Sequence, residues 1–198
     1  MDARELFLVQ HSFVQSKEVG GNPASAAERT FGGLTDDQMR VRPREDLNSL
    51  AWLMWHIARA EDIFVGAVIA GRDQVFDDAW MKRLNVTRKD FGIGMKSPEV
   101  TDLTGRIDVG ALREYRDAVG ARTREIVGAF KDADWGGTID PAPLERLAGQ
   151  GAVPPTLAKV FSGRPRVAVL NSIALFHPSG HMGEAVTVRT TGGFGTGV

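Results

Sequence analysis

Hydrophobic positions recur at helical spacing in four long stretches of the chain, and each stretch predicts a helix. In the third stretch, for example, apolar side chains return every three or four residues from Leu112 to Phe130. We predict long helices over about residues 2–17, 47–70, 109–131 and 166–190. The first is expected to bury Leu6, Phe7, Phe13 and Val14. The second is expected to begin after a cap at Asp46 or Asn48 and to stop at Gly71.

Two long connections separate these stretches, at residues 72–108 and 132–164. Connections of this length rarely lack structure of their own, so short helices are expected within them, at about 77–84, 144–148 and 156–161. No segment shows the period-two alternation of a β-strand. The sequence therefore predicts an all-α fold, a four-helix bundle with long crossover connections that contain short helices. Neither a repeat nor a linker divides the chain, so we expect a single domain over 1–198.

The composition changes this picture mainly by what it excludes. The chain has 198 residues, is 42% hydrophobic and 25% charged, and has a net charge of −1. These values are typical of a globular protein and give no reason to expect nucleic acid or a membrane as partner. The N-terminus lacks the features of a secretory signal, so a cytoplasmic location is expected. Because the chain has no cysteine, any catalytic thiol must arrive as a substrate.

The candidate chemistry lies in the histidines. Of four histidines, three fall in apolar, helix-forming stretches: His56, His177 and His181. The last two are spaced i, i+4, which places both on one side of a helix. Neutral imidazole is a common metal ligand, and three protein ligands with an open fourth position describe a catalytic metal site.

Helical phasing indicates where these side chains point. Set at 100° per residue, His56 shares an arc with apolar residues, whereas Glu61 and Asp62 fall outside it. On the fourth helix, His181 lies about 40° from His177, and Glu184 about 20° to the other side. We therefore expect two imidazoles and a carboxylate on one buried stripe. Buried polar groups need partners, and a metal ion would satisfy all of them together.

Two alternatives stay open at this point. A single inward histidine is more often a hydrogen-bonded core residue than a ligand. Moreover, Pro178 directly follows His177 and removes the backbone bond to Ala174, so the helix either breaks there or bends at its ligand-bearing turn. We favour the bend because apolar spacing resumes at Val186 and Val188.

The other polar and aromatic candidates have simpler interpretations. Arg59 flanks the ligand face and either binds an anionic group of the substrate or, as we favour, is a surface salt-bridge partner. Trp52 and Trp55 are expected in the core, with the alternative that Trp52 lines the pocket. His11 has no partner at ligand spacing and is interpreted as an ordinary helix residue.

Two segments resemble a known family. NSLAWLMWHIARAED resembles the second helix of the DinB/YfiT-like superfamily, and HPSGHMGEAVTVRTTGG resembles its fourth helix with H-x-x-x-H. The preceding GLTDDQMRVRPREDLNSLAWLMWH also has the family's order of leucine, acidic stretch, Arg-Pro and Asn-Ser. The resemblance covers about residues 1–193. Pro178 within the H-x-x-x-H and the extended connection at 132–164 depart from the family pattern.

This resemblance implies a four-helix bundle, frequently a homodimer, that holds one divalent metal ion (zinc, nickel, iron or manganese) through His56, His177 and His181. Characterised relatives include S-transferases that use bacillithiol, mycothiol or glutathione, and mycothiol-dependent isomerases. Glu184 stands where relatives often have glutamine or another polar residue, so it is a ligand, the partner of a ligand or a proton acceptor.

The sequence thus leads to two hypotheses of different class. The first is a metal-dependent transferase or hydrolase that joins a low-molecular-weight thiol or water to a small electrophile. The second is a metal-binding or stress-response bundle without turnover, in which the metal is structural or absent. Metal content and thiol-transfer activity distinguish the two.

Overall fold

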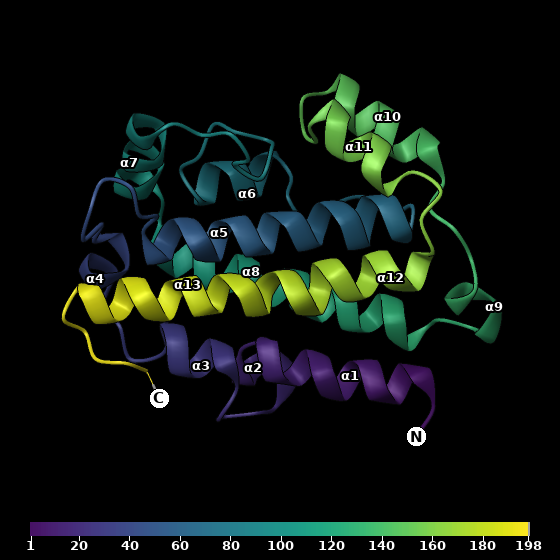
Figure 1. The fold of residues 1–198 in the computed structure, drawn as a ribbon, viewed down its shortest axis with the longest axis horizontal. Coiled ribbons are helices and arrows are strands. Elements are labelled where there is room, and N and C mark those ends of the chain that lie inside the picture. The colour runs from purple at the N-terminus through teal and green to yellow at the C-terminus, as the bar shows by residue number, and fades with distance from the viewer. Residues whose placement is uncertain (198) are drawn as a thin grey trace.

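The computed structural model describes residues 1–197. All regular secondary structure in this part of the chain is helical (Figure 1). Within it there is no β-strand, and Thr138 forms an isolated bridge with Pro165. The all-α prediction is therefore confirmed for these residues. The helices are α1 (Ala3–Val14), α2 (Lys17–Gly20), α3 (Ala26–Phe31), α4 (Asp36–Arg40), α5 (Leu50–Glu61), η1 (Asp62–Ile69), α6 (Asp78–Arg83), α7 (Ser97–Arg106), α8 (Val109–Gly128), α9 (Asp132–Trp135), α10 (Pro141–Gly149), α11 (Pro155–Phe161), α12 (Arg166–Asn171), η2 (Ser172–Phe176) and α13 (His177–Thr191).

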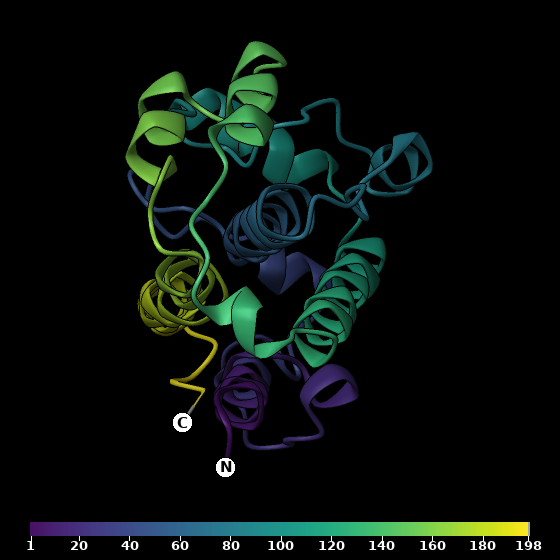
Figure 2. The same ribbon diagram turned by 90° about the vertical axis from the view of Figure 1, so that its right-hand side faces the viewer.

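Four long helical segments lie roughly along one direction: α1, α5 with η1, α8, and α12 through α13 (Figures 1 and 2). Helix α5 packs against both α8 and α13, while α1 packs against α8 and η2. On the remaining side of the segment formed by α5 and η1, the shorter helices α6 and α7 lie over α5, and α10 and α11 lie over η1. As a result, every residue from Leu50 to Ile69 is buried.

Helix α5 begins at Leu50, and its cap lies one residue after the later of the two predicted caps, Asn48. Ser49 is its N-cap and accepts a hydrogen bond from the Trp52 amide at 3.0 Å. Asn48 instead points across to α13 and hydrogen-bonds Glu184, so neither predicted cap is used. The segment then continues as the π-helix η1 up to Ile69 and ends before Gly71, as predicted.

The fourth long helix runs through Pro178 without a break. It comprises α12, the π-helical turn η2 and then α13, which starts at His177. Pro178 has no N–H and cannot bond the carbonyl four residues back. The wider π turn lies where that bond is missing, as is common for π-bulges inside α-helices. The prediction that the helix continues past Pro178 is confirmed.

The first helix differs from its prediction in length and in its buried face. It ends at Val14, and the separate short helix α2 starts at Lys17. Phe7 and Val14 are buried as predicted, but Leu6 and Phe13 are 47% and 56% exposed. The prediction was wrong for Leu6 and Phe13 because the buried side of α1 includes the polar residue His11.

Short helices form in both connections. Helix α6 matches the expectation at 77–84, and α10 and α11 match those at 144–148 and 156–161. Helix α7, between α6 and α8, was not predicted; it buries only Val100, Leu103 and Thr104 and so shows little apolar periodicity. Among residues 1–197, no helix has both the length and the apolar character that a membrane crossing requires.

Candidate metal centre

The fold brings three histidines from two helices into one cluster. His56 comes from the middle of α5, while His177 and His181 occupy the first and second turns of α13. One nitrogen of each ring lies within 4.8 Å of one nitrogen of both others. The closest pair is His56 Nε2 and His177 Nε2, 3.0 Å apart. The structure therefore places together the three residues that phasing predicted to lie on the inward faces of two helices.

His56 is held by the chain around it. Its Nδ1 lies at hydrogen-bond distance from the Phe91 carbonyl oxygen. Because a carbonyl can only accept, Nδ1 carries the proton and Nε2 presents its lone pair to the cluster. The Trp52 ring stacks on the imidazole, with centroids 4.8 Å apart and planes within 9°. Trp52 thus supports the cluster in addition to packing in the core.

Burial keeps two of the imidazoles neutral. Burial lowers the pKa of His56 to about 4. Burial, together with the neighbouring His56 and His181, lowers the pKa of His177 to about 3. Both side chains are therefore uncharged near neutral pH, which is the form that binds metal.

A carboxylate orients the third imidazole. His181 Nδ1 lies 2.9 Å from Glu184 Oε2, and the Asn48 amide donates to Glu184 Oε1 at 2.9 Å. The hydrogen bond from His181 lowers the pKa of the Glu184 carboxyl, against the opposing effect of burial. With its Nδ1 proton donated to Glu184, His181 presents Nε2 as its free nitrogen. Glu184 is thus placed as the partner of an imidazole.

These nitrogen atoms suit a divalent metal ion. Two histidine nitrogens bound to one zinc ion at its usual bond length stand roughly 3.3 Å apart in tetrahedral geometry, close to the 3.0 Å between His56 and His177. Imidazole ligands also match metals of intermediate softness, such as zinc, nickel and iron. His56 is 4% exposed, whereas His177, His181 and Glu184 are half-buried rather than buried as predicted. The cluster therefore faces solvent on its α13 side.

Arg59 lies one turn after His56 but belongs to a different polar cluster. It is 1% exposed. Its Nη1 donates to Asp62 Oδ2 at 3.1 Å and to the Tyr115 hydroxyl at 3.0 Å. Its Nη2 donates to Gln74 and to the Lys89 carbonyl oxygen. The favoured assignment to a surface salt bridge was wrong, because the ion pair with Asp62 is buried.

His11 is also more than an ordinary helix residue. It is fully buried, and its Nε2 lies 3.0 Å from Glu61 Oε1. Gln15, one turn later on the same helix, donates to Glu61 Oε2 at 2.9 Å. Glu61 and Asp62, which phasing left outside the inward arc, are therefore buried as well. The spacing of His11 and Gln15 was the only sequence signal of this cluster.

Comparison with known proteins identifies the family. The family model described as the DinB superfamily matches residues 24–159, about two thirds of the chain. The match includes α5 with His56 and ends before α13 with His177 and His181. No curated protein matches the chain.

Proposed function

Because this chain belongs to the DinB superfamily, we propose that it is a metal-dependent enzyme whose single divalent ion is held by His56, His177 and His181. The observation that carries the proposal is the convergence of three imidazole nitrogens within 4.8 Å. Two of the imidazoles are neutral, and two are oriented through Nδ1 by fixed acceptors. A similar hydrogen bond from the second nitrogen is found on most metal-binding histidines. The four long segments would form the family's four-helix bundle.

We propose transfer of a thiol, or of water, to a small electrophile. A divalent ion bound here would supply Lewis acidity and lower the pKa of a thiol or water. The chain's own residues would position that ion: Phe91 and Trp52 fix His56, and Asn48 fixes Glu184. Glu184, beside the cluster, is the candidate to accept the proton of the incoming group. Since the protein has no cysteine, the thiol would be a low-molecular-weight co-substrate.

The proposal extends to partners and assembly. The net charge of −1 supports a small-molecule substrate rather than nucleic acid or a membrane. We further propose a single domain, a cytoplasmic location and a homodimer; the last rests on the family alone. We do not propose that Arg59 binds an anionic group of the substrate, because its guanidinium is already bonded to Asp62 and three other groups.

Metal content tests the site. The protein is purified without chelator and analysed for metals, together with His56→Ala, His177→Ala and, as a control outside the cluster, His11→Ala. We expect about one ion per chain in the wild type and in the control, and little in the two cluster variants. Glu184→Gln should weaken metal binding by about 10–100-fold, because it loosens the hold on His181. A wild type that carries no metal and takes up neither zinc nor nickel would refute the site.

Activity tests the reaction separately. The metal-loaded protein is assayed with a panel of low-molecular-weight thiols and small electrophiles, with the His177→Ala protein as the blank. We expect thiol consumption that needs both metal and His177. If metal binds and raises the melting temperature while no thiol or water is transferred, the metal is structural and the non-catalytic hypothesis replaces the enzyme.

A further inference from the structure

The three histidines of the cluster differ in what supports them. His181 is bonded directly to a carboxylate, that of Glu184. His56 is bonded to the Phe91 carbonyl oxygen, and the Nδ1 of His177 has no hydrogen-bond partner among the described residues. A metal-binding histidine usually donates its second N–H to a carboxylate, a carbonyl or a water. The acceptor of His56 is a neutral carbonyl, so its strength depends on the groups that hold it.

The Phe91 carbonyl belongs to a peptide group that is held at both ends. This trans peptide joins Phe91 to Gly92. Its C=O accepts a hydrogen bond from His56 Nδ1, and its N–H, the amide of Gly92, donates to Asp90 Oδ1 at 2.8 Å. In a planar trans peptide the C=O and the N–H point in opposite directions. By fixing the N–H, Asp90 therefore also fixes the direction of the carbonyl that His56 uses.

Gly92 is tightly enclosed by two indole rings. Its φ of 89° lies in the left-handed region that favours glycine. A Cβ atom there would lie 2.7 Å from Trp55 Cζ3 and 2.9 Å from Trp52 Cζ2, both on buried side chains. Trp52 in turn stacks on His56. The peptide group therefore cannot shift without disturbing the ring that covers the imidazole.

The Asp90 carboxylate is itself anchored. Arg88 donates from Nε to Asp90 Oδ1 at 3.2 Å and from Nη2 to Asp90 Oδ2 at 2.9 Å. Its Nη1 donates to Glu99 Oε1 at 2.8 Å, so one guanidinium serves two carboxylates and neutralises Asp90 only in part. One residue before Asp90, the Lys89 carbonyl oxygen accepts from the buried Arg59. The loop that carries the peptide group is thus fixed to both α5 and α7.

From these contacts we propose that Asp90 is a positioning residue for His56 and acts on it through the intervening peptide group. A carboxylate on the N–H end polarises the peptide and makes its carbonyl oxygen a stronger acceptor, because linked hydrogen bonds strengthen one another. The stronger acceptor holds the proton on Nδ1 and makes Nε2 a better metal ligand. The effect on metal binding rests on the proposed function, whereas the effect on the His56 proton does not.

The location of the His56 proton tests this assignment without metal. Long-range proton–nitrogen NMR spectra of the chelator-treated protein report which ring nitrogen of each histidine carries the proton. We expect His56 to be protonated at Nδ1 in the wild type and to gain a share of the Nε2–H form in Asp90→Ala, with His181 unchanged. Glu184→Ala should give the reverse pattern, since it removes the acceptor of His181 alone. A His56 spectrum that does not respond to Asp90→Ala overturns the proposal.

Zinc affinity, measured by competition with a chromogenic chelator, tests the consequence for metal binding. Asp90→Ala should bind zinc about tenfold more weakly than the wild type. Asp90→Asn keeps an oxygen for the Gly92 amide but lacks the charge, so we expect an intermediate affinity. Asp78→Ala is the matched control, because this exposed acid pairs with Lys89, the residue before Asp90. It should change neither the zinc affinity nor the His56 spectrum.

The outcomes separate this role from the metal site itself. If the wild type binds no zinc while the His56 proton still depends on Asp90, the metal site fails and the positioning role stands. If zinc binds equally well to the wild type and to Asp90→Ala, the positioning role fails and the metal site stands. Circular dichroism checks the fold of each variant. If Asp90→Ala does not fold, Asp90→Asn decides, and wild-type zinc affinity in that variant overturns the proposal.

Discussion

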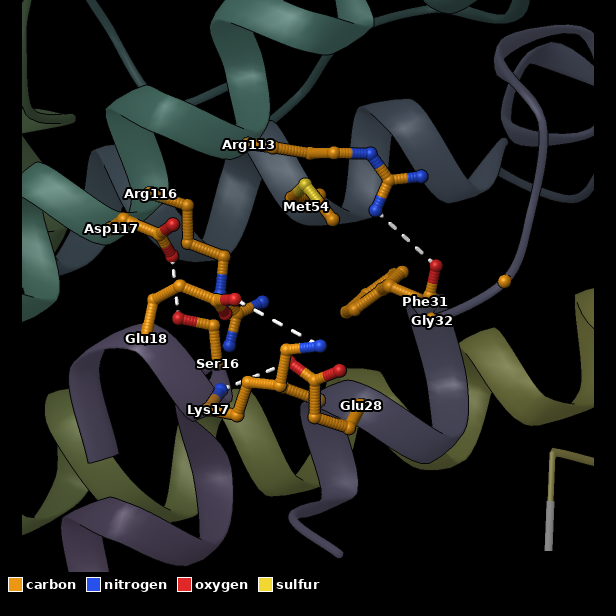
Figure 3. Close-up of a pocket in the computed structure, with 12 residues that line it drawn as sticks. Ser16, Lys17, Glu18, Glu28, Phe31, Gly32, Met54, Arg113, Arg116 and Asp117 are labelled. Carbon is orange, nitrogen blue, oxygen red and sulfur yellow. Dashed lines mark hydrogen bonds and ion pairs between the residues drawn. The ribbon is translucent and has the colours of Figure 1, made fainter. Parts of the chain in front are cut away.

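Two arginines, Arg59 and Arg116, are almost completely buried beside α5 and η1, and their surroundings differ sharply. Arg59 donates four hydrogen bonds and forms an ion pair with Asp62, and its Nε alone has no partner among the described residues. Arg116 donates one hydrogen bond, to Val14, and leaves Nε and Nη1 free. The acids near them are sequence neighbours, Asp62 and Glu61. Yet Arg59 completes a polar cluster, whereas Arg116 lies at the edge of a pocket (Figure 3) and keeps two donors without partners among the described residues.

The difference arises from what else each acid binds. Asp62 turns one oxygen toward Arg59 and Tyr115 and also accepts from the backbone amides of Val75 and Phe76. Glu61 is occupied by His11 and Gln15. Arg116 therefore acts on Glu61 only through its charge, without direct contact. The comparison teaches that two buried guanidinium groups with acids nearby can differ in whether they form a direct ion pair.

The same substitution at both arginines gives the largest expected contrast. Arg59→Met would leave the Asp62 carboxylate buried without its counter-ion, and we expect a loss of about 3–5 kcal/mol in the free energy of unfolding. Arg116→Met breaks no ion pair but leaves the Val14 carbonyl oxygen without its donor, so the loss should be about 1–3 kcal/mol. Urea denaturation at neutral pH measures both. Equal losses would show that Arg116 is as firmly paired as Arg59.

The Glu61→Gln variant tests Glu61, which is bound by His11 and Gln15 rather than by an arginine. The new amide group would face the amide of Gln15 or the ring of His11, leaving one buried donor unpaired. We expect a loss of about 1–3 kcal/mol in the free energy of unfolding. The exposed Asp73→Ala, on the loop after η1, should change stability by less than about 0.5 kcal/mol. If the two variants lose the same small amount, the cluster around Glu61 contributes nothing.

The pH dependence of the Glu61→Gln effect tests the same cluster, with a smaller expected change in the free energy of unfolding. Burial alone raises the pKa of the Glu61 carboxyl, but hydrogen bonds from His11 and Thr123 and the charge of Arg116 outweigh it, and the pKa is lowered from 4.5. The stabilisation is therefore complete above the unfolded value and is lost as the pH falls below about 4.5 through the folded pKa. The difference in unfolding free energy between wild type and Glu61→Gln should shrink from pH 6 to pH 3. A constant difference would contradict the lowered pKa.

The sequence was sufficient for the long helices and for the histidines because both depend on local spacing. Phasing placed His56, His177 and His181 on inward faces, and these faces meet. It failed for Glu61 and Arg59 because it assumes that a helix has one polar side facing water, whereas α5 is covered on every side. Burial of those side chains depends on partners that are distant in sequence.

The supports of the histidine cluster were out of reach for a related reason. His56 is oriented by the backbone carbonyl of Phe91, a group that every residue has and that no residue type reveals. Asn48 resembles a helix cap in sequence, and its bond to Glu184 on α13 spans 136 positions. Whether the Asn48 side chain caps α5 or binds Glu184 is determined by the fold alone.

The π-helical turn η2 determines which changes in length the fourth long helix can accept. It lies between α12, which buries Val169 and Leu170, and α13, which carries His177 and His181. Deleting one residue from 172–176 would leave both the apolar pattern and the histidine spacing intact. A π turn holds one residue more than an α turn, so such a deletion would let it close as ordinary α-helix, with α12 and α13 keeping their present faces. An inserted residue would instead rotate α12 by about 100° relative to α13 and turn Val169 and Leu170 out of the core, so this stretch should tolerate shortening better than lengthening.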